Sequence, residues 1–162
     1  MARARFSEIL RLLAMNEVEF IVVGMTAGVL QGAPLTTFDL DIVHRRTPEN
    51  VARLLSVLGE LEAVHRHDPR GLSPRESHLL GPGHQFLSTT KGDLDCLGSI
   101  DDGKSYEELL APAVEMRLTS GLSVRVLGLP ALLAMKERAG RPKGLAAIPL
   151  LRATLEESKR RS

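Results

Sequence analysis

Two pairs of aspartates are the residues of this sequence whose spacing most suggests chemistry. Asp39 and Asp41 alternate with the apolar residues Phe38, Leu40 and Ile42, a pattern typical of a half-buried strand, so both carboxylates project from its other face. Carboxylates one pleat apart repel each other unless a cation lies between them, and Mg²⁺ is commonly held by one or two carboxylates together with substrate phosphates. Because an isolated Asp-x-Asp is more often a solvated strand end, the pair needs support from other residues.

A second acidic pair supplies that support. Asp93 and Asp95 share one face of the predicted strand 93–97, while Leu94 and Cys96 share the other. Cys96 is therefore expected to be a small buried hydrophobic residue. Two strands that each carry paired acids are much harder to explain as solvated strand ends.

Composition limits the fold and the partners. The chain has 162 residues, of which 43% are hydrophobic, and this predicts one domain that spans residues 1–162. Its net charge of +1 gives no global field for nucleic acid or membrane, and aromatic residues at 3% weaken any proposal of base stacking. The lone cysteine excludes an internal disulfide, and the lack of a long apolar run favours a cytoplasmic protein without membrane contact.

The elements before the first acidic pair would form a small anion-binding turn. A helix that begins near Arg3 is followed by an almost continuously apolar strand at residues 19–23, then by Gly24 and a short helix over residues 25–32. Unpaired backbone N–H groups point outward where a strand turns into a helix, so such a turn can hold an anion. Thr37 is either a hydrogen-bond partner for a carboxylate or simply a strand former.

The remaining pattern alternates helices and strands. Residues 47–61 predict a capped helix, 61–64 a short strand, 66–83 an irregular excursion, 85–88 a strand, 105–112 a short helix, 114–118 and 122–126 a hairpin, and 130–140 a helix. In a last helix Pro149 must lie in the first turn or cause a kink. Four histidines around the excursion match no zinc-site spacing and are expected to be solvated: His65, His67, His78 and His84.

Three cations follow near the C-terminal end of the penultimate helix. Lys136 falls on or beside the apolar stripe of that helix. Its side chain could snorkel to solvent or reach a phosphate across the sheet edge, and the sequence leaves both open. Arg141 and Lys143 add two further charges just beyond the helix.

Taken together, these residues resemble the nucleotidyltransferase superfamily typified by DNA polymerase beta. Its pattern is an apolar strand, Gly followed by Gly or Ser, a short helix, an Asp-x-Asp strand and a third carboxylate downstream. The matching residues are Gly24, Asp39, Asp41 and Asp95, and residues 37–42 fit the wording T-x-D-h-D-h. The likeness is greatest to a small bacterial branch that includes abortive-infection toxin nucleotidyltransferases, which often carry Lys, Ala-Gly-Arg and Lys-Asp where Lys136, residues 139–141 and Lys143 stand.

The resemblance implies an α/β (α+β) nucleotidyltransferase fold, with a short mixed sheet and helices mainly on one face. It also implies transfer of a nucleoside monophosphate from a nucleoside triphosphate such as ATP to a hydroxyl acceptor. Asp39, Asp41 and Asp95 would be the catalytic and metal-binding residues for two Mg²⁺ ions, which Mn²⁺ could replace. The triphosphate would be bound by residues of the turn and of the cationic group: Gly24, Met25, Thr26, Thr37, Lys136, Arg141 and Lys143. The acceptor stays open among tRNA, a protein and a small molecule, and an antitoxin-like partner protein would be compatible.

Four positions depart from the family pattern: Met25, Leu35, Gly144 and Ala147. They motivate an alternative in which a degenerate nucleotidyltransferase fold binds a nucleotide or a partner protein without catalysis. A third interpretation is a regulatory α/β module whose acidic strands are unrelated. The retention of Asp39, Asp41 and Asp95 argues against the degenerate fold, since a protein without catalysis has no physical reason to keep three mutually repelling acids. The regulatory module would show no response to divalent cations.

Overall fold

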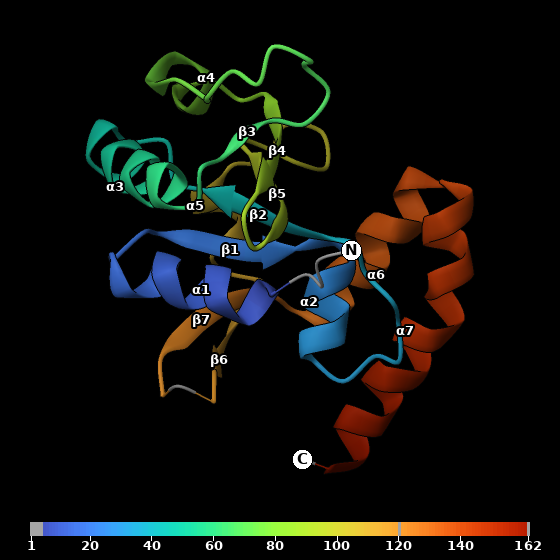
Figure 1. The fold of residues 1–162 in the computed structure, drawn as a ribbon. Coiled ribbons are helices and arrows are strands. Elements are labelled where there is room, and N and C mark those ends of the chain that lie inside the picture. Colours follow the sequence, from blue (N-terminus) through green and yellow to red (C-terminus); the bar gives the residue numbers. More distant parts are fainter. Residues whose placement is uncertain (1–4, 120, 162) are drawn as a thin grey trace.

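A mixed seven-stranded sheet forms the centre of the computed structural model, which describes residues 5–119 and 121–161 (Figure 1). The strands are β1 (Phe20–Val23), β2 (Asp39–His44), β3 (Val64–His65), β4 (His84–Thr89), β5 (Gly92–Leu97), β6 (Ala113–Arg117) and β7 (Ser123–Leu127). Their order across the sheet is β3-β4-β5-β2-β1-β7-β6. The α/β fold with a mixed sheet that the sequence predicts is confirmed.

The helices are α1 (Phe6–Met15), α2 (Gly24–Leu30), α3 (Pro48–Glu60), α4 (Glu76–Leu80), α5 (Tyr106–Leu109), α6 (Leu129–Ala139) and α7 (Pro142–Arg161). The expected start of the first helix near Arg3 lies outside the described residues, and α1 begins at Phe6. The capping signals work as predicted, since the Thr47 hydroxyl accepts a hydrogen bond from the Asn50 N–H and Gly140 ends α6 in the left-handed conformation.

The register of the central strands brings the two acidic pairs side by side. β1 is buried along its whole length and pairs antiparallel with β2, whose other edge pairs parallel with β5. In that parallel ladder Asp39 lies opposite Asp93, and Asp41 lies opposite Asp95. Because paired residues share a face, all four carboxylates project from the same side of the sheet, as the alternation predicts.

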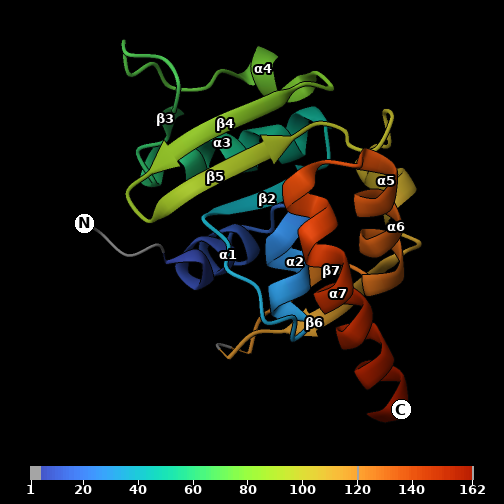
Figure 2. The same cartoon turned by 90° about the vertical axis from the view of Figure 1, so that its right-hand side faces the viewer.

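Helices cover the sheet unequally. α1 and α3 contact each other over one face, and Figure 2 shows α3 behind β4 and β5. On the opposite face α5 lies near β7, where the Arg125 guanidinium donates to the Tyr106 hydroxyl at 3.1 Å. α2, α6 and α7 gather beyond the end of β1, and α2 contacts both β2 and α6. The acid-bearing end of β2 and β5 is therefore bordered by helices.

Three details differ from the sequence prediction. The excursion at residues 66–83 contains a helix, α4, and the short strand before it is β3 at Val64–His65. The last helix begins at Pro142, so Pro149 lies in its interior rather than in its first turn. There the proline ring removes one backbone hydrogen-bond donor from the helix.

Across residues 5–119 and 121–161 the structure has no helix long and apolar enough to cross a membrane.

Candidate active site

Three carboxylates converge where β2 and β5 lie side by side. One oxygen from each of Asp39, Asp41 and Asp95 lies within 4.8 Å of the others. The fourth acid, Asp93, lies outside this group and is half-exposed, with its carboxylate 3.7 Å from the Arg66 guanidinium. We call Asp39, Asp41 and Asp95 the acid cluster.

Asp41 is the most constrained member of the acid cluster. Its Oδ1 atom is buried and has no hydrogen-bond partner. Burial, together with the nearby charges of Asp95 and Asp39, raises the pKa of Asp41 to about 8. Burial also raises the pKa of Asp95, although the Arg66 guanidinium opposes that shift. The cluster therefore disfavours its own ionised form unless a cation compensates the charge.

The donor set of the acid cluster fits a hard divalent cation. It offers carboxylate oxygens alone, with neither sulfur nor imidazole, and this combination suits Mg²⁺ or Mn²⁺ better than zinc. The unpartnered Oδ1 of Asp41 is a ligand atom that the protein leaves free. The residues present thus fit the metal that the sequence pattern implies.

Gly24 is the turn residue that lets the chain pass close to the acid cluster. Its φ of +68° is a left-handed conformation, and a Cβ atom at this position would overlap Oδ2 of Asp41. No other residue type meets both conditions without strain. Glycine is therefore required here, whereas the anion binding expected of this turn stays a prediction.

Two threonines fix the start of β2 through its backbone. The hydroxyls of Thr26 and Thr37 each donate to the Asp39 carbonyl oxygen at 3.0 Å, and the two hydroxyls lie 3.3 Å apart. Neither interpretation left open for Thr37 holds: its partner is a main-chain carbonyl, and the residue lies before the first residue of β2. Thr37 thus orients Asp39 indirectly, by holding the backbone that carries it. Met25, between Gly24 and Thr26, is partly buried against the core.

The cationic group gathers beside the acids. Lys136 is close enough to Asp41 and Asp39 for their charges to raise its pKa, although burial dominates and the net shift is downward. Arg141 and Lys143 also act on Lys136 and lower its pKa further, which places all three cations together. The Lys143 ammonium lies 5.8 Å from the ring centroid of Phe38, an exposed aromatic residue next to Asp39.

Arg66 is a functional candidate that the sequence analysis missed. Its guanidinium donates to Oδ1 of Asp95 at 2.9 Å and to the Leu87 carbonyl oxygen at 2.9 Å, and lies over the Phe86 ring. The residue follows directly after β3, so alternation from His65 would have placed its side chain on the acidic face. That signal was hidden because the sequence assigned Arg66 to an irregular segment.

Three of the departures from the family pattern have packing roles. A Cβ atom on Gly28 of α2 would approach both Leu35 and Leu151, so Leu35 fills the space between α2 and α7. Gly144 is buried, and a Cβ there would lie 3.3 Å from Cδ of Lys136, so the glycine leaves room for the lysine stem. Ala147 is 3% exposed and belongs to the core. These residues pack against α7 and Lys136, so their departure from the family pattern does not indicate a loss of function.

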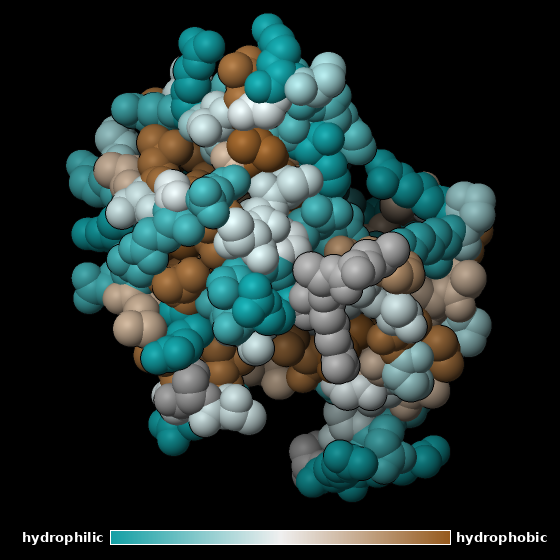
Figure 3. Space-filling view, in the orientation of Figure 1, coloured by the Kyte–Doolittle hydropathy of each residue, from teal (hydrophilic) through white to brown (hydrophobic). Residues whose placement is uncertain are grey.

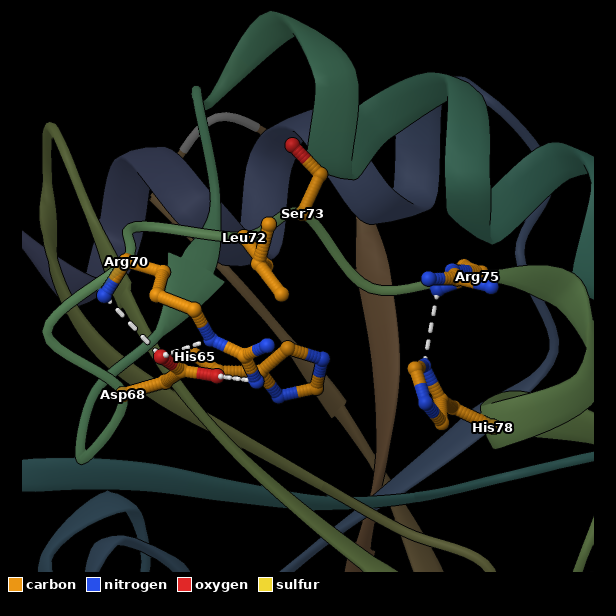
Figure 4. Close-up of a pocket in the computed structure, with 7 residues that line it drawn as sticks. All are labelled: His65, Asp68, Arg70, Leu72, Ser73, Arg75 and His78. Carbon is orange, nitrogen blue, oxygen red and sulfur yellow. Dashed lines mark hydrogen bonds and ion pairs between the residues drawn. The ribbon is translucent and has the colours of Figure 1, made fainter.

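A separate cavity of about 340 Å³ lies on the other side of β3 (Figure 4). It is lined by His65, Asp68, Arg70, Leu72, Ser73, Arg75 and His78. His65 pairs with Leu87 in the ladder and so points away from the face that carries Phe86 and Asp95. The His65 and His78 rings meet edge to face at 4.9 Å, and both residues are half-buried. His67 and His84 are exposed, as the sequence predicts for all four histidines. The space-filling view shows a different hollow, a notch between the part of the surface built by β3, β4 and β5 and the helices α6 and α7 (Figure 3).

The chain is similar in fold to several solved nucleotidyltransferase structures. A candidate nucleotidyltransferase from Thermotoga maritima aligns over 97% of this chain and 96% of its own, with a TM-score of 0.59 and 19% identity. The antibiotic-resistance enzyme ANT(2")-Ia, solved with adenylyl-2"-tobramycin, aligns over 95% and 89%, with a TM-score of 0.61 and 16% identity. The lincosamide adenylyltransferase LnuA, solved with lincomycin, aligns over 92% and 95%, with a TM-score of 0.61 and 16% identity. No protein-family model and no curated protein sequence matches the chain. The chain therefore has the nucleotidyltransferase fold, as the resemblance of its motifs implies.

Proposed function

We propose that this protein is a metal-dependent nucleotidyltransferase, an enzyme that transfers a nucleoside monophosphate from a nucleoside triphosphate to a hydroxyl acceptor. The observation that carries the proposal is the buried, unpartnered Oδ1 of Asp41 inside a cluster of three acids. Such an arrangement destabilises the folded state in the absence of a cation, and a bound cation would compensate the charge of the three carboxylates. The nucleotidyltransferase fold of the chain supports the same function.

Asp39, Asp41 and Asp95 would hold two Mg²⁺ ions, or Mn²⁺ in their place, which bind substrate phosphates and stabilise the charge that develops during an in-line displacement. The N–H groups that follow Gly24, in residues Met25 and Thr26, point outward at the start of α2 and would contact the phosphates. Lys136, with Arg141 and Lys143 beside it, would offset the charge of the leaving pyrophosphate.

The proposed transfer forms one bond to phosphorus and breaks another. The acceptor hydroxyl oxygen forms a bond to the α-phosphorus, and the bond from that phosphorus to its bridging oxygen breaks, so that pyrophosphate leaves. Asp95, which lies opposite Asp41 in the ladder, would accept the hydroxyl proton. Arg66, which donates to Oδ1 of Asp95, would hold that carboxylate in position.

The identity of the substrates follows less directly. Two structural neighbours are adenylyltransferases of antibiotics, which favours ATP as donor and extends the acceptor class to small molecules. A tRNA, a protein hydroxyl and regulation by an antitoxin-like partner protein are proposals carried by the resemblance of the sequence alone.

Thermal unfolding with nucleotides tests the proposal. The wild type and Asp41→Asn are heated with each nucleoside triphosphate, with and without Mg²⁺. A ligand at a hundredfold excess over its Kd stabilises the folded state by about 2.7 kcal/mol, enough for a visible shift in Tm. We expect a Mg²⁺-dependent shift that Asp41→Asn loses.

Glu115→Gln is the matched control, because it removes an exposed strand carboxylate from β6, three strands away from β2. This variant should keep the full Tm shift. Equal shifts in the wild type and in Asp41→Asn would contradict the metal-nucleotide site. A shift that persists while no acceptor ever becomes labelled would favour a nucleotide-binding module over an enzyme.

A further inference from the structure

The cavity beside β3 lies apart from the acid cluster, on the opposite face of the sheet. His65 of β3 pairs with Leu87 of β4, so these two side chains share one face. Asp95 and Phe86 pair with each other on the other face. The remaining lining of the cavity comes from residues 68–75 and from α4. Its volume of about 340 Å³ is in the range of sites for small organic molecules.

Positive charge predominates in the lining of this cavity. Two arginines, Arg70 and Arg75, stand against one acid, Asp68, so the lining carries a net positive charge even with its histidines neutral. The Asp68 carboxylate is already engaged, because Arg70 donates from Nε to its Oδ1 at 3.0 Å and from Nη2 to its Oδ2 at 2.8 Å. These hydrogen bonds lower the pKa of Asp68 to about 2. The acid is therefore compensated by Arg70, and the charge of Arg75 is left over.

Arg75 and His78 form one end of the cavity. In the part of the chain that the structure describes, no carboxylate forms an ion pair with the Arg75 guanidinium. The Arg75 main-chain N–H donates to Nδ1 of His78 at 3.0 Å, so the proton of a neutral His78 ring is on Nε2, which is a second donor. Figure 4 shows Arg70 and Asp68 at the other end, with the His65 ring between the two ends. Donors therefore face the same space from two sides.

The rest of the lining combines an incompletely satisfied polar group with an apolar one. Nε2 of His65 is buried and makes no hydrogen bond with any described residue. Buried polar atoms without a partner are uncommon in folded proteins, so this part of the structure is not a finished core. Leu72 is 38% exposed and Ser73 adds a hydroxyl group. This lining suits a ligand that has both an anionic part and an organic part.

We propose that the cavity beside β3 binds a small phosphate monoester, at a site separate from the acid cluster. Arg75 and the Nε2–H of His78 donate to the phosphate oxygens, and the N–H groups of Arg70 that Asp68 does not engage approach the same anion from the other end. A phosphate group has three strong acceptor oxygens, so it can accept from several donors at once. Leu72 contacts the organic part of the ligand. This binding needs no metal ion and goes beyond the proposed nucleotidyl transfer.

A metal ion is the occupant that the lining disfavours. Among residues 5–119 and 121–161, the group of three side chains placed to hold a metal is the acid cluster, and His65, His78 and Asp68 do not form a second one. The two arginines of the cavity would also repel a cation. The charge of the lining therefore favours an anion.

Titration of the metal-free protein tests the proposal. Wild type, Arg75→Ala and Arg117→Ala are titrated in EDTA with ribose 5-phosphate, glycerol 3-phosphate, inorganic phosphate and ribose. Calorimetry gives each Kd, and the imidazole NMR signals of His65 and His78 report whether the ligand is in the cavity. Arg75→Ala removes the guanidinium but keeps the main-chain N–H that holds His78. Arg117 is the matched control, because it is an exposed arginine of β6, at the opposite edge of the sheet from β3.

We expect both monoesters to bind the wild type and to shift the His78 signal. Their Kd should rise about 10- to 100-fold in Arg75→Ala, the usual consequence of losing hydrogen bonds from a charged donor. Arg117→Ala should bind them like the wild type. Inorganic phosphate should bind more weakly than the monoesters, because it lacks the part that contacts Leu72, and ribose should not bind.

Three results overturn the inference. Equal affinity of the monoesters for wild type and Arg75→Ala, or binding that leaves the His78 signal unchanged, would place the ligand elsewhere. Binding of ribose as tight as that of ribose 5-phosphate, or of inorganic phosphate as tight as that of the monoesters, would remove the assignment to a phosphate monoester. Absence of binding by both monoesters would do the same. The Mg²⁺-dependent nucleotide shift in Tm is measured separately, so none of these results decides the proposed function.

Discussion

Asn50 and Asp41 are both polar residues withdrawn from solvent, and they differ in how many partners the protein gives them. Asn50 of α3 is fully buried, and its side chain makes three hydrogen bonds. Its Oδ1 accepts from the Glu19 N–H at 2.7 Å, and its Nδ2 donates to the carbonyl oxygens of Glu19 and Arg45 at 2.9 and 2.8 Å. Asp41 has a buried oxygen with no partner and two acids as neighbours.

The contrast separates a structural polar group from a functional one. Asn50 satisfies backbone groups at the ends of the strands, so its burial stabilises the fold. Asp41 destabilises the fold unless a cation is bound, and such a cost persists where binding or catalysis needs it. Substitution of the two residues should therefore have opposite effects on stability.

Asp41→Asn should give the largest effect on activity. Loss of one metal-binding carboxylate is expected to lower kcat about 10²- to 10³-fold, the usual consequence of removing one stabilising group from a transition state. At pH 7 without divalent cations, the same change should raise Tm. Folding of the wild type has to protonate Asp41, whose pKa rises to about 8, whereas asparagine is already neutral. Activity assays and melting curves in EDTA measure the two effects, and a lower Tm in EDTA would contradict the comparison.

Asn50→Ala should give the largest effect on stability. It removes the hydrogen bonds of the Asn50 side chain to the Glu19 N–H and to the carbonyl oxygens of Glu19 and Arg45, of which the Glu19 oxygen still accepts from the Arg45 N–H. We expect a loss of about 2–4 kcal/mol in the free energy of unfolding. Urea denaturation measures this loss. Asn16→Ala is the control, because Asn16 makes a single side-chain hydrogen bond at the end of α1, and it should cost less than about 1 kcal/mol. Equal losses would show that the three side-chain hydrogen bonds of Asn50 stabilise the fold no more than the single one of Asn16.

The strands and the shared face of the aspartates within each strand could be foreseen, because both depend on local periodicity. Alternation in β2 and in β5 assigns each aspartate to a face without knowledge of the neighbouring strand. Gly24 could be foreseen too, because a turn between a buried strand and a helix favours glycine. The pairing of β2 with β5 in the register that aligns Asp41 with Asp95 was not visible in the sequence, since it depends on tertiary contacts.

Arg66 and Asn50 could not be foreseen for the same reason. Arg66 contacts Asp95, 29 residues away, and Asn50 contacts Glu19, 31 residues away. Side-chain hydrogen bonds between distant segments leave no periodic trace in the sequence. The exposed ring of Phe86 was hidden likewise, because its alternation in β4 predicts a face but not what covers that face.

Gly24→Ala should destabilise the protein by about 1–3 kcal/mol, because a Cβ atom is strained at a left-handed φ and would overlap the Asp41 carboxylate. Activity should fall as well, since the carboxylate has to move. Gly103→Ala is the matched control: Gly103 has a φ of +87°, but a Cβ atom added there would meet nothing within 4 Å. The difference in Tm between the two variants measures the part of the cost that comes from Asp41, and equal costs would assign all of it to the backbone.

His44 is expected to give the smallest effect, which appears only in acid. Its Nε2 lies 2.7 Å from the Leu79 carbonyl oxygen, its Nδ1 is buried without a partner, and burial lowers its pKa. Since the unfolded chain binds the proton more readily than the folded one, stability is lost as the pH falls below about 6.5, with a slope of at most about 1.4 kcal/mol per pH unit for one proton.

The variant His44→Gln keeps a donor for the Leu79 carbonyl oxygen and removes the group that titrates. The difference in unfolding free energy between wild type and His44→Gln should therefore change between pH 7 and pH 5, and a constant difference over that range would show that His44 titrates normally. Asp41 contributes equally to both proteins, so it cancels from this difference.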